Sequence, residues 1–306
     1  MTPSQLHDNP ELETETLVHA VVVAYRSAET LRGCVEPLAA MPGVSVTVVD
    51  NASPDESADV VADLDVTVIR APRNGGFSYG CNLGAADAAA PYLLFLNPDA
   101  RIDADALTGL IDVLRANPDT GLVGPRILDD DGSLSPSLRR FPRLRSTYAQ
   151  ALFLHRVWPL ASWTDELIRD ETVYAVAGTA EWVSGACMLV RRDAYEQIGG
   201  FDERFFLYCE DTDLCLRLWN AGFAVRFEPS AVVHHVGGAS SGAGETQAIA
   251  ARSRVLYARK HQRPMTRRLE ALGVALSEAT HVLSAARRPA SRRGHAAALR
   301  AVVRSA

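Results

Sequence analysis

The amino-acid sequence predicts an α/β fold in which a mostly parallel sheet is flanked by helices. Two observations lead to this prediction. Segments typical of strands and helices alternate four times within about the first hundred residues, and the strand-like segments are almost continuously apolar. With 306 residues, 47% of them hydrophobic and 22% charged, the chain has a globular composition and enough length to bury a sizeable core.

The first four strands are expected at residues 17–25, 44–50, 66–70 and 92–96. The first is rich in β-branched residues and lacks alternating polar positions, which is typical of a strand buried on both faces. Helical spacing and turn residues predict the connections: a helix over 27–40, a turn at 51–55 with a helix through 60–61, and a glycine-rich loop at 73–77 leading to a small-residue helix that ends near Ala90.

The second half of the chain is less regular. We expect helices over 107–116 and 212–221 and strands over 121–124, 181–190 and 223–227, followed by a loop rich in His and Gly at 234–244. Residues 129–175 mix turn residues, arginines and aromatics, and we interpret them as a long functional loop region rather than core. From residue 245 onward the pattern is helical and increasingly basic.

Cysteine usage and the chain's hydropathy point to a protein kept inside the cell. The five cysteines are scattered and form no Cys-x-x-Cys pair, which argues against a disulfide framework or a zinc site and fits a reducing cytosol. Residues 1–15 are polar and acidic and lack the pattern of a signal peptide. Because no run of about 18 apolar residues occurs, we expect no membrane-spanning helix.

The net charge of −6 conceals an asymmetry. Residues 252–306 hold 13 Arg and Lys against two acids, a net +11 on an otherwise acidic chain. A basic tail indicates an anionic partner, such as phospholipid headgroups or a lipid diphosphate, with nucleic acid as the rival interpretation. A solvated helical face would account for the charge equally well.

Two carboxylates follow predicted strands at the sheet edge where ligands gather. Asp50 ends the second strand and Asp99 lies just past the fourth. In open α/β sheets, ligands bind beyond the carboxyl ends of the strands. There a carboxylate can accept hydrogen bonds from a pyrimidine or ribose, or hold a divalent cation. Each aspartate alone is more simply a turn former.

The usual phosphate-binding loops are missing. The first strand continues into Tyr25-Arg-Ser-Ala-Glu-Thr, so no Gly-x-Gly-x-x-Gly follows it, and no Gly-x-x-x-x-Gly-Lys-Ser/Thr occurs. A bound nucleotide therefore needs another neutralising group for its diphosphate. A metal ion on Asp99 is the simplest candidate.

Three acids begin the helix expected over 212–221. Asp213 is spaced to pair with Arg217 four residues on, which leaves Glu210 and Asp211. An aromatic stretch precedes them, and a carboxylate beside an apolar wall is suited to general-base catalysis. The alternative is that these acids only stabilise the helix N-terminus.

Two neighbouring histidines, His234 and His235, follow the last predicted strand. A His beside a glycine-rich loop is a candidate metal ligand, although a lone His is more often an ordinary surface residue.

Together these segments resemble the family-2 glycosyltransferases of the GT-A fold, and in particular the rhamnosyltransferase branch that builds cell-wall and O-antigen polymers. The resemblance covers residues 18 to about 240. Its motifs occur in the family's order: Val21-Val-Val-Ala-Tyr25, Val49-Asp-Asn-Ala-Ser53, Asn74-Gly-Gly-Phe77 with Asn82, Leu96-Asn-Pro-Asp99, Ser184-Gly-Ala186, Gly200-Phe-Asp-Glu203, Phe205-Phe206, Glu210-Asp-x-Asp-Leu214 and His235.

The resemblance implies a role for each matching position. For the donor nucleotide, it implies that Asp50 contacts the pyrimidine near Ala24 and Tyr25, and that Asn74, Gly75 and Asn82 line the pocket. For the acceptor, it implies that Asp211 is the catalytic base and that Trp182, Ser184 and Gly185 belong to the sugar and acceptor pocket. Arg252 and Tyr257 would lie on a helix that closes the site.

The resemblance also implies a divalent metal cofactor, Mg²⁺ or Mn²⁺. Asn97-Pro-Asp99 matches the family's Asp-x-Asp motif, with Asp99 as metal ligand, and His235 matches its metal-binding histidine, with His234 as the alternative. Asn97 departs from the motif by removing a negative charge, so a lower metal affinity is expected.

We therefore expect three parts: a flexible tail over 1–16, a catalytic domain over 17–244 with a nucleotide half (17–100) and an acceptor half (101–244), and a helical basic extension over 245–306. The expected function is inverting sugar transfer from a nucleotide sugar, dTDP-rhamnose first and UDP-sugars next, to a polyprenyl-diphosphate-linked or glycan acceptor. The alternatives are a nucleotidyltransferase and a catalytically silent sugar-nucleotide-binding or membrane-scaffold protein.

The enzyme is expected at the cytoplasmic face of the inner membrane, which its basic extension would bind. No nucleic-acid partner is expected, and an oligomer is possible. Each basic residue near an anionic membrane contributes about 1 kcal/mol. The apolar face of an interfacial helix is expected to comprise Leu269, Leu272, Val274, Leu276 and Leu283.

Overall fold

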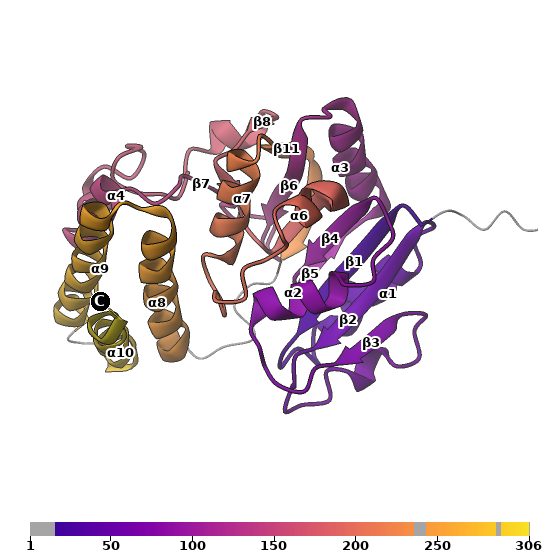
Figure 1. Ribbon diagram of the computed structural model, residues 1–306, viewed down its shortest axis with the longest axis horizontal. Helices are drawn as coiled ribbons and strands as arrows, with labels where there is room; N and C mark the ends of the chain where they lie inside the picture. Colours follow the sequence, from indigo (N-terminus) through magenta and orange to yellow (C-terminus); the bar gives the residue numbers. More distant parts are fainter. Residues whose placement is uncertain (1–15, 236–242, 286–288, 306) are drawn as a thin grey trace, which may run out of the picture.

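The computed structural model describes residues 16–235, 243–285 and 289–305. Residues 16–235, about three quarters of the chain, form an α/β body, and three helices lie beside it (Figure 1). These are α8 (Ala243–His261), α9 (Pro264–Ser284) and α10 (Pro289–Ser305).

The central sheet has the strand order β3-β2-β1-β4-β10-β6-β11-β5, and β8 adds to β11. Neighbouring strands from β3 to β4 are parallel, β10 runs antiparallel between β4 and β6, and β6 is parallel to β11. The predicted mixed, mostly parallel sheet is confirmed. Its strands are β1 (Val18–Ala24), β2 (Val44–Asp50), β3 (Thr67–Arg70), β4 (Tyr92–Leu96), β5 (Ala100–Ile102), β6 (Thr120–Leu128), β8 (Gly178–Thr179), β10 (Cys187–Arg191) and β11 (Ala224–His235).

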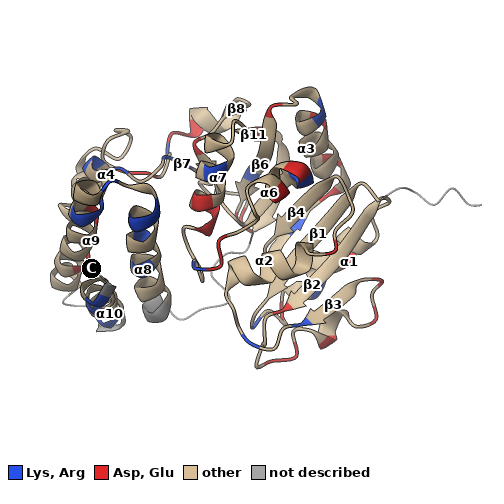
Figure 2. Ribbon diagram, in the orientation of Figure 1, with Lys and Arg blue, Asp and Glu red and all other residues tan. Residues whose placement is uncertain are grey.

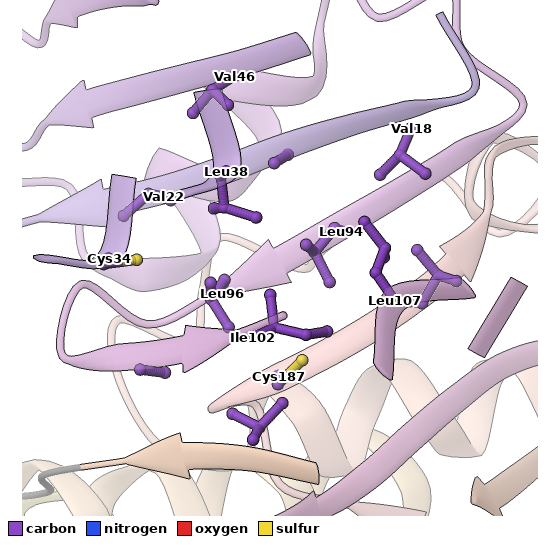
Figure 3. Packing of buried hydrophobic residues seen from close by; sticks show 14 of the residues in the cluster. Val18, Val22, Cys34, Leu38, Val46, Leu94, Leu96, Ile102, Leu107 and Cys187 are labelled. Atoms are coloured by element: carbon purple, nitrogen blue, oxygen red, sulfur yellow. The ribbon is translucent and has the colours of Figure 1, made fainter. Parts of the chain in front are cut away.

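Hydrophobic cores lie on both faces of the sheet. One face packs against α1 (Leu31–Ala39) and α3 (Ala104–Ala116), where Leu38 and Leu107 meet strand residues such as Val22 and Leu94 (Figure 3). The other core includes residues of α2 (Phe77–Ala85), α6 (Arg192–Gln197) and α7 (Glu210–Asn220). Because both faces are covered, β1 and β4 are almost entirely buried, as their continuous apolar runs predicted.

Helix α2 lies unusually close to the sheet because its small residues allow it. A Cβ atom added at Gly80 would stand 2.6 Å from Val23 Cγ1, and one at Gly84 would overlap the Val21 side chain. This close packing fixes where the loop before α2 meets the carboxyl ends of β1 and β2.

Several predicted elements differ from the structure. The helix expected through residues 60–61 is a single 3₁₀ turn (Asp59–Val61). The strand expected over 181–190 is divided into β9 (Trp182–Val183) and β10. The loop expected from residue 234 begins later, because His234 and His235 are the last residues of β11; residues 236–242 of that loop lie outside the described residues.

The interpretation of residues 129–175 as loop rather than core is wrong. The segment contains β7 (Leu138–Arg139), α4 (Leu144–Ala151), α5 (Leu154–Val157) and a 3₁₀ helix (Glu171–Ala175). Tyr174 is fully buried, and its hydroxyl donates to the Ile168 carbonyl. No local pattern predicted this order, because the segment's partners are distant in sequence: Tyr174 packs against Phe227, and Glu166 pairs with Arg254.

The C-terminal helices dock on the body through buried ion pairs. Arg254 on α8 pairs with Glu166, and its Nε lies 2.7 Å from Glu270 of α9. Lys260 Nζ, near the end of α8, lies 2.7 Å from Asp202 and 2.6 Å from Asp213. Figure 2 shows basic residues along α8 and acidic residues at the start of α7. Part of the tail's positive charge is therefore neutralised within the protein.

Two expectations about the extension are settled by burial. Val274 is 7% exposed and packs in a small core with Val255 and Val302, so it does not belong to an outer apolar face. Leu272 and Leu283 are 60% and 76% exposed, as expected of such a face. None of the helices in the described part of the chain is both long and apolar enough to cross a bilayer. All five cysteines are free.

Candidate active site

A cleft of about 520 Å³ opens between the sheet, the start of α7 and the helices α4, α8 and α9. It is lined by Phe77, Asn97, Arg139, Thr147, Gln150, Glu166, Trp182, Ser184, Gly185, Ala186, Leu207, Tyr208, Cys209, Glu210, Asp211, Thr212, Ala250, Ala251, Arg254, Val274, Ser277 and Glu278.

Strand pairing brings Asn97 together with residues 184–186 at this cleft. Strands β4 and β10 are antiparallel with Leu96 opposite Cys187, so the turn after β4 meets the turn before β10. The Asn97 N–H donates to the Ala186 carbonyl at 2.9 Å. Residues 97–99 and 184–186, far apart in sequence, therefore share one edge of the sheet, at the carboxyl end of β4.

Asp211 is fixed at the cleft by backbone donors. The Gly185 N–H donates to its Oδ2 at 3.1 Å, and the Thr212 N–H donates to its Oδ1 at 2.7 Å. The preceding Tyr208 and Cys209 have φ angles of 67° and 64°, a conformation uncommon outside glycine. This turn places the start of α7 at the cleft, so that its first two carboxylates, Glu210 and Asp211, line it.

Glu210 and Asp211 lie in different polar environments although they are adjacent. Glu210 is 6% exposed, and its Oε2 is buried with no hydrogen-bond partner among the described residues. Burial raises the pKa of Glu210 well above its ordinary value, and the neighbouring Asp211 charge adds to this. Burial raises the pKa of Asp211 too, but donors from Gly185 and Thr212 oppose the shift. Burial thus favours the protonated form of both groups, and the donors to Asp211 favour placing the negative charge on that residue.

Asp99 and His235 meet at the other side of this edge. Strand β5 pairs antiparallel with β11, with Ala100 opposite His235. As a result His235 Nε2 lies 3.1 Å from Asp99 Oδ1 and 3.3 Å from Asn97 Nδ2. Asp99 is 8% exposed. The neighbouring His234 is exposed and stands opposite Arg101, so His235 is the histidine next to Asp99.

These side chains fit a divalent cation that shares its coordination with a diphosphate. A carboxylate oxygen and an imidazole nitrogen suit Mg²⁺ or Mn²⁺, and such ions usually complete their coordination with phosphate oxygens and waters. Within the residues that the structure describes, no group of three or more His, Cys, Asp or Glu could hold a metal alone.

The predicted nucleotide-binding residues lie beyond β1 and β2. Asp50 is buried; its Oδ1 accepts from the Ser53 N–H at 2.9 Å, and its Oδ2 lies 3.8 Å from Arg70. Asn74 Oδ1 accepts from the Gly76 N–H at 3.0 Å, which closes the glycine loop. Ala24 ends β1, and Tyr25 follows with the Arg26 guanidinium over its ring.

Sequence reasoning missed Asn51, which holds the glycine loop in place. Its Oδ1 accepts from the Gly75 N–H at 3.0 Å, and its Nδ2 donates to the Gly76 carbonyl at 3.0 Å. Its position directly after Asp50, at the end of a buried strand, could have indicated a role at this edge of the sheet.

Asn82 has a different environment from the one its motif implied. Its Nδ2 donates to the Phe201 carbonyl and Glu203, and its Oδ1 accepts from the Tyr195 hydroxyl and the Phe201 N–H. These bonds use the full capacity of the amide within the protein. In this structure Asn82 ties α2 to the segment that precedes α7.

The acceptor-side residues are partly as expected. Trp182, Ser184 and Gly185 line the cleft, and so does α8, through Ala250, Ala251 and Arg254.

Arg252 and Tyr257 lie on α8 as expected but line no part of this cleft: Arg252 is exposed elsewhere, and Tyr257 is buried. Arg139 and Arg254, which do line the cleft, were missed because no local sequence pattern distinguishes them from other arginines.

The chain is similar to known sugar-transferring proteins. The family model described as glycosyl transferase family 2 matches residues 20–199, and one described as N-terminal domain of galactosyltransferase matches residues 174–236. An N-acetylglucosaminyl-diphospho-decaprenol L-rhamnosyltransferase of Mycobacterium tuberculosis is 35% identical over 227 residues, covering 70% of this chain and 73% of the relative.

A rhamnosyltransferase of Escherichia coli, WbbL, is 31% identical over 163 residues, covering 51% of this chain and 58% of the relative. Among solved structures, a mannosyltransferase from Pyrobaculum calidifontis in complex with GDP-Man and Mn²⁺ has a TM-score of 0.57 at 17% identity, covering 99% of this chain and 90% of that one. The similarity to this mannosyltransferase structure shows the fold alone. The family match and the relatives' identity together show that the chain belongs to glycosyl transferase family 2 and is a glycosyltransferase with rhamnosyltransferases among its relatives.

Proposed function

We propose that this enzyme transfers rhamnose from dTDP-rhamnose, with inversion, to a lipid-linked N-acetylglucosaminyl diphosphate during surface-glycan synthesis. The donor and acceptor follow the names of its relatives, one of which is a rhamnosyltransferase that acts on such a lipid. The observation that supports the proposal most is the cleft itself, where Asp211 and the Asn97 end of the Asn97-Pro-Asp99 motif line the same space.

The proposed reaction is a single displacement. Asp211 removes the proton from the acceptor hydroxyl while that oxygen attacks the anomeric carbon, and the bond from that carbon to the nucleotide diphosphate breaks. A divalent metal held by Asp99 and His235 would neutralise the charge on the departing diphosphate.

Glu210 has a supporting part in this proposal. Burial favours its protonated form, and the negative charge is placed on Asp211, where the Gly185 and Thr212 N–H groups stabilise it. Asp211, rather than Glu210, is therefore the proposed base.

A transfer assay with donor-binding calorimetry tests the metal assignment. Asp99→Ala should lose the part of the donor affinity that depends on Mg²⁺ or Mn²⁺, because one of two protein ligands is removed. Unchanged donor affinity in both metal and chelator would refute Asp99 as ligand. Donor binding without transfer to any acceptor would favour the catalytically silent alternative, and formation of a nucleotide sugar from a sugar phosphate would favour the nucleotidyltransferase.

We also propose that the enzyme rests on the cytoplasmic leaflet through an apolar and basic face. Exposed apolar side chains gather on α9 and on the neighbouring α4–α5 corner, Leu152, Val157, Trp158, Leu160 and Trp163. The two places are adjacent, since Thr280 of α9 donates to the Ala151 carbonyl at 2.8 Å. Half-exposed tryptophans and leucines beside arginines are typical of interfacial surfaces.

Vesicle co-sedimentation of the full chain tests this face. Truncating the tail would break the buried Arg254 ion pairs, so substitutions are preferable. Trp158→Ser with Leu160→Ser should lower the fraction bound to phosphatidylglycerol-containing vesicles severalfold, whereas Val176→Ser, at an equally exposed site away from α9, should not. Equal binding by both variants and the wild type would refute the proposed face.

A further inference from the structure

The charges around the cleft are unevenly compensated. Four acids line it, Glu166, Glu210, Asp211 and Glu278, and two of the described lining residues are cations, Arg139 and Arg254. Arg254 is held between Glu166 and Glu270 and also donates to Thr147 at 3.0 Å. Its charge is thus matched by carboxylates before any ligand arrives.

Arg139 is in the opposite situation. In the part of the chain that the structure describes, no carboxylate lies within salt-bridge distance of its guanidinium, and no group accepts a hydrogen bond from it. The side chain is half-buried at the wall of the cleft. A guanidinium carries five N–H donors in a planar array that matches phosphate oxygens.

The scaffold holds this side chain in place without using its donors. Arg139 on β7 stands opposite Trp182 on β9, and its guanidinium lies 5.4 Å from the centre of the Trp182 ring. The indole N–H of Trp182 donates to the Arg140 carbonyl at 3.0 Å, which fixes the ring. Stacking on an aromatic face orients a guanidinium while leaving its N–H edge available to an anion.

The position of Arg139 distinguishes which anion it would meet. The donor diphosphate is proposed at Asp99 and His235, next to strands β5 and β11. Arg139 comes from the β7–β9 ribbon, which lies on the acceptor side with α4 and its cleft-lining residues Thr147 and Gln150. It is close enough to Asp211 for its charge to lower the pKa of that carboxyl.

We propose that Arg139, stacked on Trp182, binds the diphosphate of the lipid-linked acceptor and thereby selects acceptors that carry one. This inference rests on the proposed function, because it assigns the acceptor's anionic group to a site beside the proposed base. An acceptor hydroxyl at Asp211 and a diphosphate at Arg139 would be held from two ends, which orients the sugar between them.

The experiment compares two acceptors and two variants of the full chain. The acceptors are N-acetylglucosamine linked through a diphosphate to a short prenyl chain, and the uncharged octyl glycoside of the same sugar. The variants are Arg139→Gln and the control Arg140→Gln, which removes the same charge one residue on; Arg140 is not among the described residues lining the cleft. KM values are compared at a pH well above the acid limb of the wild-type profile, so that Asp211 stays ionised in every sample. The acid limb of kcat is recorded separately for each variant.

Arg139→Gln should raise KM for the diphosphate acceptor at least about tenfold, the typical effect of losing a charge-assisted contact. Its KM values for the octyl glycoside and for the donor should stay within about twofold of wild type. For Arg140→Gln, the KM values for the diphosphate acceptor, the octyl glycoside and the donor should all stay within about twofold of wild type. Arg139→Lys should recover part of the loss, because the charge returns without the planar array.

Two results would overturn the inference. Equal increases in KM for the two acceptors would mean that Arg139 maintains the shape of the cleft. An unchanged KM with a shifted acid limb of kcat would mean that its role is to tune Asp211. Failure of the wild type to glycosylate either acceptor would instead contradict the proposed function, so the two failures are distinguishable.

Discussion

Adjacent carboxyl groups can differ in their hydrogen-bond partners, and Glu210 and Asp211 are such a pair. Burial raises the pKa of both carboxyl groups, but only Asp211 accepts hydrogen bonds from the Gly185 and Thr212 N–H groups. The sequence indicated that one of the two is the base because three acids begin one helix. The acidic cluster alone could not distinguish them, since the Gly185 N–H that fixes Asp211 comes from a distant strand connection. Only the family resemblance implied Asp211.

The buried Glu210 predicts how stability depends on pH. Since its pKa in the folded protein lies above the ordinary 4.5, the folded state holds a proton that the unfolded chain releases, so the free energy of unfolding falls as pH rises above that value. Glu210→Gln should lessen this fall by up to about 1.4 kcal/mol per pH unit. Urea unfolding at several pH values measures this dependence. The same slope of unfolding free energy against pH in Glu210→Gln and wild type would contradict the prediction, and Glu196→Gln, at an exposed position, is the control.

Gly76 is a second residue whose role follows from its surroundings. Its φ is 87°, and an added Cβ would overlap the Phe206 carbonyl oxygen. Gly76→Ala should therefore destabilise the fold by more than about 1 kcal/mol and weaken donor binding by displacing the loop. Gly109→Ala on α3, where a Cβ meets open space, should stabilise by about 0.5–1 kcal/mol. Thermal unfolding compares them, and equal melting temperatures for Gly76→Ala and wild type would refute the argument.

At the scale of elements, α8 joins the catalytic body to the C-terminal helices. The strands β1, β2 and β4 could be predicted from sequence because each is a short apolar run with local signals at both ends. Segment 129–175 could not, because Glu166 meets its partner Arg254 only across 88 residues. Such pairings leave no periodic pattern. The placement of His235 beside Asp99 likewise depends on β5 pairing with β11.

Breaking the α8 network should be costly. Arg254→Met leaves Glu166 and the fully buried Glu270 without their cation, so we expect a loss of about 3–5 kcal/mol in the free energy of unfolding. Arg252→Met, at an exposed position on the same helix, should change it by less than about 0.5 kcal/mol. Denaturant unfolding measures both, and similar midpoints for the two variants would contradict a structural role for this network.

At the scale of the whole molecule, the two halves of the sheet supply different parts of the proposed site. The parallel half brings Asp50, the glycine loop and Asp99 to the carboxyl ends of its strands, and the antiparallel insertion of β10 brings Ser184 to Ala186 and Asp211 against them. The fold class and these motif positions could be read from sequence. The contribution of α4 and α9 to the cleft could not, because it arises from long-range docking. A helix at the site was expected from Arg252 and Tyr257, but the residues that α8 presents to the cleft, such as Arg254, were not.

The assignment of Asp211 as the base is the claim on which the account most depends, and one variant tests it directly. Asp211→Asn keeps the shape and the amide oxygen that accepts from Gly185 but cannot take a proton. We predict that transfer from dTDP-rhamnose to the diphosphate-linked acceptor falls by at least about 10²-fold, while calorimetry in Mg²⁺ or Mn²⁺ gives an unchanged donor affinity. Retained transfer, or an equal loss of transfer and donor binding, would contradict the account.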